Sequence, residues 1–324
     1  MQFNAEQNRC AENMAMAYDA WIANERAWHQ HRDRLSWKTV KGRDYLYRVV
    51  DRRGNGKSLG PRSAELEEFE RGYSSRRDAA QAARKSLSGR LTEVGRIARA
   101  VRLPGVDETV GRILAESDRR DMLGQTLIAV GTNAMLAYAY AAGVIMAPEL
   151  QSTADFDLAW SARREAFALA ERGTRPIFNM LKAVDSTFTV NTERSFQARN
   201  ADAFEVELLA APSVVDAIPK AEPLRPVGNL PEQEWLLRGT PVREIVRAGA
   251  TGVCAIVAPD PRWFALHKLW LSRKPSRNRR KVQKDHKQGQ LLWEMARAGQ
   301  FALHPVDDEF IDGLPEELRQ VLAG

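Results

Sequence analysis

The stretch "TLIAVGTNAMLAYAYAAGV", residues 126–144, decides how the centre of this chain folds. The short apolar run Leu127–Val130 predicts a buried strand, and the alanine-rich run 133–142 predicts a helix. Gly131-Thr132 lies at the junction, where free backbone N–H groups and the positive end of the helix dipole meet. Such a junction binds phosphate, and Thr132 is equally suited to be an ordinary N-cap, so the two interpretations are compatible.

A second stretch, "TADFDLAW" at residues 153–160, predicts a strand with two acidic residues. Because side chains alternate along a strand, Asp155 and Asp157 share one face while Phe156 and Leu158 occupy the other. Neighbouring carboxylates repel unless a cation lies between them, and a divalent metal is the usual solution. Taken alone, an Asp-x-Asp pair is more typical of a solvated strand edge.

A third stretch, "FEVELL" at residues 204–209, predicts another strand with Glu205 and Glu207 on one face. Glu207 is the preferred third acid because it lies deeper in the apolar strand, and Glu205 remains an alternative. A phosphate cradle and three carboxylates could hold two Mg²⁺ ions that activate a hydroxyl and neutralise a transferring phosphate.

The remaining pattern predicts an α+β protein in three parts. We expect a helix over 4–32, β-hairpins, a long charged helix from about 63 to 102 and a shorter helix to about 118. Further strands are expected near 187–190 and 253–257, with a helix between 159 and 187, and helices after the Pro-Asp-Pro at 259–261. The predicted parts are an N-terminal helical region with a β-hairpin (1–118), a mixed α/β domain (119–258) and a basic helical domain (259–324).

The order strand, Gly-Thr, helix, Asp-x-Asp strand and third-acid strand resembles the nucleotidyltransferase fold of the DNA polymerase β superfamily. Within it, the chain is similar to a bacterial group of nucleotidyltransferase-fold proteins. The flanks "YLYRVVDRRGNGKSLGPRSAELE" (45–67) and "FALHKLWLSRKPSRNRRKVQKD" (264–285) also look similar to that group, so the resemblance covers most of the chain. Two departures are Gly-Thr in place of Gly-Gly or Gly-Ser, and Glu in place of Asp as the third acid.

The resemblance implies roles for six residues. Gly131, Thr132 and Lys268 would contact the triphosphate of an NTP. Asp155 and Asp157 would bind both Mg²⁺ ions, with Mn²⁺ as an alternative metal, and Glu207 would be the third ligand and the base toward the acceptor. His267, beside Lys268, is a candidate proton donor or nucleotide contact, although a lone helical histidine is more often structural or on the surface.

The implied reaction is metal-dependent transfer of a nucleoside monophosphate from an NTP to a hydroxyl acceptor. RNA, for example a tRNA 3′ end, is the favoured acceptor, and a protein side chain or a small molecule would serve the same chemistry. The resemblance also suggests toxin or phage-defence roles. The alternative is a nucleotidyltransferase-fold module that has lost turnover and binds nucleic acid or protein.

The preference for RNA rests on basic residues. The 324-residue chain has 48 Lys and Arg against 42 Asp and Glu, and ten of the Lys and Arg fall between 262 and 287. We expect a nucleic-acid interface there, and an ordinary solvated face is equally compatible. The candidate residues are Arg273, Arg277, Arg279, Arg280 and Lys281.

Composition argues against other classes. The longest nearly apolar run, Met135–Ala147, is shorter than the roughly 18 residues that a membrane span requires. The N-terminus has no apolar segment typical of a secretion signal, and the two cysteines, Cys10 and Cys254, are too few for a disulfide framework. We therefore expect a cytoplasmic protein without a membrane partner.

Overall fold

The computed structural model describes residues 1–49, 54–151, 155–161, 177–216, 218, 220 and 222–323. They belong to two compact units, which are described separately. The smaller unit is Met16–Glu93, and the larger unit combines Met1–Ala15 with Val94–Gly324. Helices and mixed sheets occur together, which confirms the α+β class. The three-part division remains a prediction.

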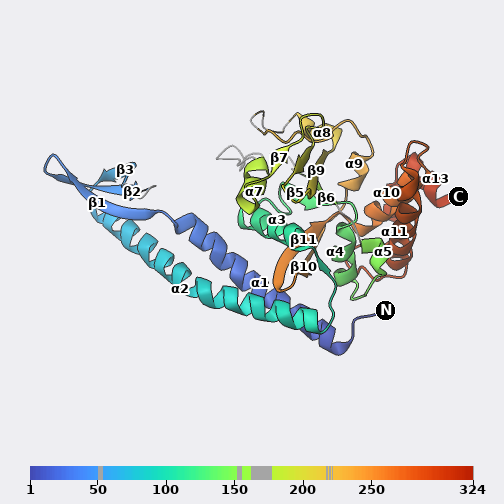
Figure 1. Ribbon diagram of the computed structural model, residues 1–324, viewed down its shortest axis with the longest axis horizontal. Coiled ribbons are helices and arrows are strands. Elements are labelled where there is room, and N and C mark those ends of the chain that lie inside the picture. Colours follow the sequence, from blue (N-terminus) through green and yellow to red (C-terminus); the bar gives the residue numbers. More distant parts are fainter. Residues whose placement is uncertain are drawn as a thin grey trace. The chain divides into compact units, whose positions relative to one another are not determined.

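The smaller unit is a helix pair that carries a sheet (Figure 1). It contains most of α1 (Ala5–His31) and α2 (Ala64–Ala100), which are linked by an ion pair of 2.6 Å between Arg84 Nε and Glu25 Oε1. Between these helices the chain forms an antiparallel sheet in the order β1-β2-β3. The strands are β1 (Arg34–Val40), β2 (Arg43–Val49) and β3 (Gly56–Pro61).

The described part of the larger unit contains two sheets and several helices. Its strands are β4 (Gly105–Val106), β5 (Leu127–Ala129), β6 (Asp155–Trp160), β7 (Thr189–Val190), β8 (Gln197–Arg199), β9 (Glu205–Ala210), β10 (Val242–Ala248) and β11 (Gly252–Ala258). Its further helices are α3 (Glu108–Arg119), α4 (Ala134–Ala141), α5 (Pro148–Gln151), α7 (Ile177–Val184), α8 (Pro212–Val215), α9 (Gln233–Leu236), α10 (Pro261–Arg273), α11 (Arg279–Arg297), α12 (Asp308–Asp312) and α13 (Glu316–Ala323).

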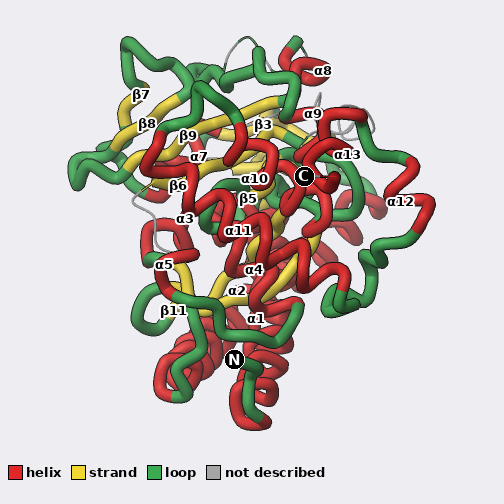
Figure 2. The backbone as a smooth tube through the Cα atoms, turned by 90° about the vertical axis from the view of Figure 1, so that its right-hand side faces the viewer, coloured by secondary structure: helices red, strands yellow, loops and turns green. Residues whose placement is uncertain are grey.

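The five-stranded sheet, with strand order β5-β6-β9-β8-β7, carries the acidic residues (Figure 2). Strands β6 and β9 are parallel, while β5 and β8 run antiparallel to these neighbours. Phe156, Leu158, Val206 and Leu208 are completely buried on one face of β6 and β9. The alternation therefore places the acidic side chains on the opposite face, as the sequence pattern predicts.

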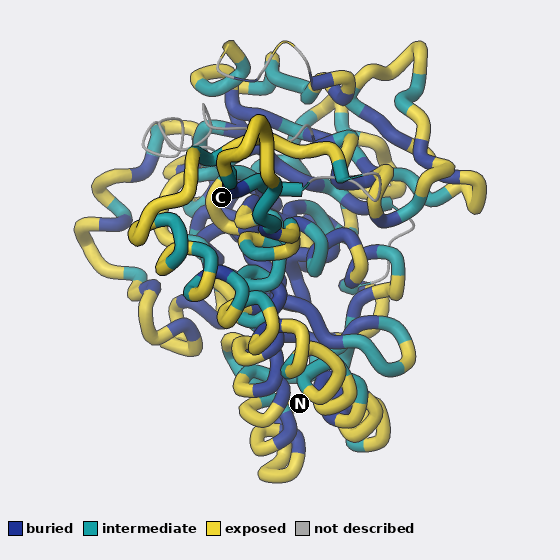
Figure 3. Tube along the Cα trace, turned by 90° about the vertical axis from the view of Figure 1, so that its left-hand side faces the viewer, coloured by how far each residue is buried: buried dark blue, intermediate teal, exposed yellow. Residues whose placement is uncertain are grey.

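The second sheet, with strand order β11-β10-β4, supports the helix that follows the Gly-Thr turn. Helices α3 and α4 pack on β10 and β11. Tyr138 in α4 is completely buried and donates to the backbone oxygen of Pro259 at 3.0 Å. In Figure 3, the dark blue stretches of the tube mark the buried residues.

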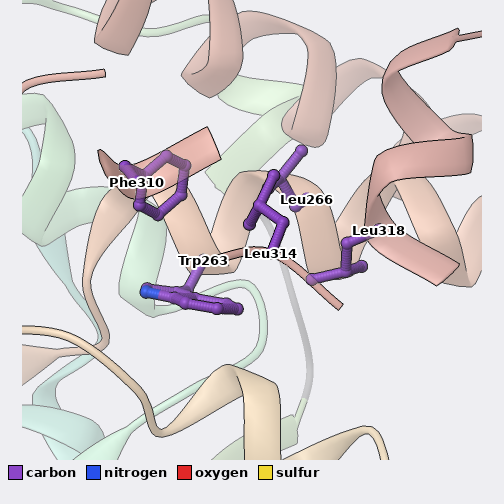
Figure 4. Packing of buried hydrophobic residues seen from close by; sticks show 5 residues of the cluster. All are labelled: Trp263, Leu266, Phe310, Leu314 and Leu318. Atoms are coloured by element: carbon purple, nitrogen blue, oxygen red, sulfur yellow. The ribbon is translucent and has the colours of Figure 1, made fainter. Parts of the chain in front are cut away.

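The C-terminal helices have a hydrophobic core of their own (Figure 4). Its buried residues are Trp263, Leu266, Phe310, Leu314 and Leu318. Helix α10 starts at Pro261, and the side chain of Asp260 caps it by accepting from the backbone N–H of Arg262 at 3.0 Å. None of the described helices is long and apolar enough to cross a membrane.

Most predicted elements are confirmed, with ends shifted by one to three residues. They include the N-terminal helix, the hairpins, the long helix, the helix near 118, the strands near 127, 155, 187, 204 and 253, and the helices after 261. A helix is predicted between residues 159 and 187. Within this range, Ile177–Val184 is observed as α7, and residues 162–176 lie outside the described part. The sequence pattern did not predict β8 or β10.

Candidate active site

The Gly-Thr turn is built around a glycine that no other residue could replace without strain. Gly131 follows β5 with a φ of +65°, a conformation that favours glycine. A Cβ at this position would overlap the carboxylate of Asp157, with that residue's Cγ only 2.8 Å away. The backbone N–H of Val130 donates to the Asp157 carbonyl at 3.0 Å. The turn is therefore pressed directly against the second acid of the Asp-x-Asp pair.

The helix after this turn starts one residue later than the Thr132 N-cap interpretation requires. Asn133 occupies the N-cap position of α4 and makes no side-chain cap. Its amide instead donates to the backbone carbonyl of Asp155 at 3.2 Å and ties the start of the helix to β6. Thr132 is thereby left beside the acidic strand, with a cavity of about 250 Å³ in front of it. That cavity is also lined by Asn133, Gln151, Asp155 and Phe204.

The strand register brings the four acidic residues together in pairs. Asp155 lies opposite Glu205, and Asp157 lies opposite Glu207, on adjacent parallel strands. Glu205 is also within 3.9 Å of the Arg199 guanidinium on β8. Glu207 has no such cation within ion-pair distance among the described residues, and its assignment as the third acid stays a prediction.

A buried glutamine holds the two glutamates from the neighbouring strand. Gln197 on β8 lies opposite Glu207, and its Nε2 donates to Glu207 Oε1 at 3.1 Å and to Glu205 Oε2 at 3.2 Å. Asn191 donates to Gln197 Oε1 at 2.8 Å, which orients the amide so that its N–H groups face the carboxylates. Gln197 is only 4% exposed, so this orientation is fixed within the protein.

The proton affinity of Asp157 reflects its surroundings. Burial, and then the negative charges of Asp155 and Glu207, raise the pKa of Asp157 from 3.8 to about 7. The positive charges of Lys268 and Lys281 act in the opposite direction. Three carboxylates thus share one electrostatic environment.

The donor set suits a divalent cation, but the side chains do not form a closed ligand cluster as they stand. Carboxylate oxygens are the ligands that Mg²⁺ and Mn²⁺ prefer. Among the described residues, however, no three His, Cys, Asp or Glu side chains converge closely enough to hold an ion. Lys281 Nζ lies 3.5 Å from Asp155 Oδ2, and Gln197 holds Glu207. Cation binding would therefore compete with these two contacts.

Lys268 forms a buried ion pair with Asp285, which Arg277 joins to make a triad. Its Nζ is 2.7 Å from Asp285 Oδ1, and the Arg277 guanidinium is 2.6 Å from Asp285 Oδ2. Burial lowers the pKa of Lys268 and the attraction of Asp285 opposes this effect. The Lys268 side chain is only 7% exposed, and its predicted contact with phosphate remains a prediction.

His267 fits the structural interpretation. It is 4% exposed, and neither ring nitrogen has a hydrogen-bond partner among the described residues. Burial, reinforced by the charge of Lys268, lowers the pKa of His267 to about 3. The ring is therefore neutral near pH 7 and holds no imidazolium proton to donate.

The predicted basic run contains cations that are paired with acidic side chains and cations that are exposed, and Lys281 is both. At least five of its ten cations form ion pairs with acidic side chains, among them Arg262 with Asp260 at 2.8 Å and Lys274 with Glu232 at 2.7 Å. Four of the five residues proposed for nucleic acid are exposed, namely Arg273, Arg279, Arg280 and Lys281. The fifth, Arg277, belongs to the buried triad.

Three residues of this site were not found by sequence reasoning. Gln197 was missed because its three-residue strand has no clear pattern, and Asp285 because only the cations of the basic run were considered. Asn133 directly follows Gly131-Thr132, so its polar side chain at a helix start was a usable signal.

Comparison with known families gives one match. A family model described as nucleotidyltransferase matches residues 108–311, a range that includes every candidate site residue. Comparison with curated proteins and with solved structures gave no match.

Proposed function

Since the chain belongs to the nucleotidyltransferase family, we propose that it transfers a nucleoside monophosphate from an NTP to a hydroxyl group and releases pyrophosphate. One observation carries the proposal. The Gly131 turn is pressed against Asp157, and Asp157 lies in register with Glu207 on the adjacent strand. A phosphate held at the turn would therefore lie beside the acids that serve the reaction.

The turn and its surroundings would bind the triphosphate. With no side chain at Gly131, the backbone can approach a phosphate oxygen closely, and Thr132 supplies a hydroxyl next to the cavity. Lys268 and Lys281 contribute positive charge near Asp157. The same charge would attract an anionic ligand.

The acids would bind the metal and accept the proton. Asp155, Asp157 and Glu207 would hold Mg²⁺ or Mn²⁺, and the bound ions would neutralise charge on the phosphates. Glu207 would take the proton of the acceptor hydroxyl, whose oxygen forms a bond to the α-phosphorus while the bond to pyrophosphate breaks. Gln197 would keep the Glu207 carboxylate in place during this step.

The proposed acceptor is RNA, with a tRNA 3′ end as one example. Three exposed cations at the start of α11 support this acceptor, namely Arg279, Arg280 and Lys281. Lys281 also contacts Asp155, so this basic helix start reaches one of the proposed catalytic acids. A protein side chain and a small molecule are the other acceptors that this chemistry would accept, and a toxin or phage-defence role would use the same reaction.

The rival proposal is a binding module without turnover. It is favoured by the absence, among the described residues, of three converging metal-ligand side chains. The two proposals differ in what metal and nucleotide do to the folded protein, since a ligand that binds only the folded state raises its melting temperature.

The experiment is labelling with each α-labelled NTP against total RNA and total protein in the presence of Mg²⁺. We expect the label to enter RNA and Asp157→Asn to reduce transfer at least about a hundredfold. Asp202→Asn is the matched control, because Asp202 is exposed and lies outside the acidic pairs. Equal labelling by the parent and Asp157→Asn, together with a melting temperature that Mg²⁺ and NTP do not raise, would refute the transfer reaction and favour the binding module without turnover.

A further inference from the structure

One short segment has a net positive charge equal to that of the whole chain. Residues 34–61 contain eight Lys and Arg against two Asp and Glu, which accounts for the whole net charge of +6 and leaves 40 of each sign elsewhere. Asp44, the described acidic residue of this segment, accepts a hydrogen bond from Thr39 and lies 3.3 Å from Arg62. The segment runs from the start of β1 to the end of β3.

One face of this sheet is covered by the unit's own helix. Leu35 and Leu46 are buried on that face and pack with Tyr73 of α2. Trp37 lies opposite Leu46 in the register and belongs to the same cluster. The side chains of the alternate positions therefore point to the other, outer face.

The outer face presents aromatic rings and cations together. Tyr45 and Tyr47 lie two residues apart on the central strand and are partly exposed. Lys38 is the cross-strand partner of Tyr45, and its Nζ lies 5.0 Å from the centre of the Tyr47 ring. Arg34 and Arg43 are exposed at positions of the same alternation.

We propose that this outer face binds single-stranded RNA. Unpaired bases would stack on Tyr45 and Tyr47, and the phosphates would lie near Arg34 and Arg43. In a duplex the faces of the bases are stacked on one another, so they cannot stack on exposed rings of a sheet. The charge is complementary, since the segment has a large excess of cations.

The row of residues across the sheet at Tyr47 favours RNA over DNA. Tyr47 lies between Ser36 on β1 and Ser58 on β3, so hydroxyl groups flank the ring on the same face. A hydroxyl can both donate to and accept from the ribose 2′-OH, which DNA lacks. This surface belongs to the smaller unit and the acidic pairs belong to the larger one, and the inference does not require that the protein transfers nucleotides.

The test is the affinity of the full chain for a fluorescein-labelled single-stranded 15-nucleotide RNA of mixed sequence. The measurement is fluorescence anisotropy in EDTA without NTP, so its failure would leave the labelling test of nucleotidyl transfer unaffected. We expect Tyr45→Ala combined with Tyr47→Ala to weaken binding about tenfold or more, because each stacked base is lost. Phenylalanine at both positions keeps the rings and should keep the affinity within about twofold.

The cations are tested by the dependence of affinity on salt. Arg34→Ala with Arg43→Ala should reduce the slope of log affinity against log salt by about one to two. Lys85→Ala with Arg90→Ala removes the same charge from exposed positions of α2 and should leave the slope unchanged. Circular dichroism melting confirms that each variant is folded.

Four results with nucleic acid would overturn the inference, and a fifth would come from a competing polyanion. They are no binding of the single-stranded RNA, unchanged binding in the folded Tyr→Ala pair, equal affinity for the corresponding duplex, and equal affinity for DNA of the same sequence. Displacement of the RNA by polyglutamate at the same charge concentration would instead indicate an acidic protein as the partner, and would also overturn it.

Discussion

Gly131→Ala tests the close approach of the phosphate turn to the acidic pair. A methyl group at this position would meet two costs. The backbone φ of +65° is strained for any residue with a Cβ, and the new Cβ would overlap the Asp157 carboxylate, whose Cγ is 2.8 Å away. The new Cβ is fixed by the backbone of the turn, so the Asp157 side chain on β6 would have to move.

The two costs can be separated with a second glycine of the same unit. Gly299 has a φ of +72°, and a Cβ added there would have no atom within 4 Å, so Gly299→Ala should cost only the conformational strain, about 1–2 kcal/mol. Gly131→Ala adds overpacking, typically about 1–3 kcal/mol, for a total of about 2–5 kcal/mol. The expected difference between the two variants is therefore the overpacking alone.

The assay is urea unfolding of the full chain, with the free energy of unfolding compared among the parent and both variants. Asp157→Ala removes the overlapping carboxylate, so in that background Gly131→Ala should approach the cost of Gly299→Ala. If Gly131→Ala costs no more than Gly299→Ala in the parent background, the turn does not press on Asp157 and the proposed phosphate site loses its main support.

Three further predictions use the same unfolding assay. Because the folded pKa of Asp157 is raised from 3.8 to about 7, the parent should lose stability as pH rises from about 4 to 7, by up to about 4 kcal/mol without metal, and Asp157→Asn should not show this loss. A parallel pH profile in both proteins would contradict it. Asp285→Ala should cost about 3–5 kcal/mol, because it leaves the buried Lys268 without its counter-ion, and a loss under about 1 kcal/mol would show that Lys268 reaches solvent. Lys281→Ala should change stability by less than about 1 kcal/mol, since this exposed lysine pairs with Asp155 at the surface, and a larger loss would show a structural role.

The strands of the site were predictable because their information is local. Alternation in 155–160 and 205–210 places apolar side chains on one face, and the structure buries Phe156, Leu158, Val206 and Leu208 there. The Gly131 turn was predictable from the change of an apolar run into an alanine-rich one. These patterns give the faces of each strand and the order of the elements along the chain.

Contacts between distant segments were not predictable in the same way. Gln197 reaches Glu207 only because β8 pairs with β9, and a three-residue strand has too few positions to show a period. Asp285 binds Lys268 across two helices, 17 residues apart in sequence, and nothing in either helix alone requires this pair. Both residues shape the charge around the acids, so the electrostatics of the site depend on tertiary structure.

The distribution of unpaired charge was also not predictable from the sequence, because it depends on which ion pairs form on folding. The run 262–287 looked like a polyanion site because ten cations lie close together in sequence, but acidic partners such as Asp260, Glu232 and Asp285 neutralise several of them. Residues 34–61 have fewer cations in a less obvious cluster, yet none of the described Lys and Arg of this segment forms an ion pair. The electrostatic potential that a ligand meets depends on the charge that remains unpaired after folding. By this measure, the sheet β1-β2-β3 is the stronger candidate for binding RNA.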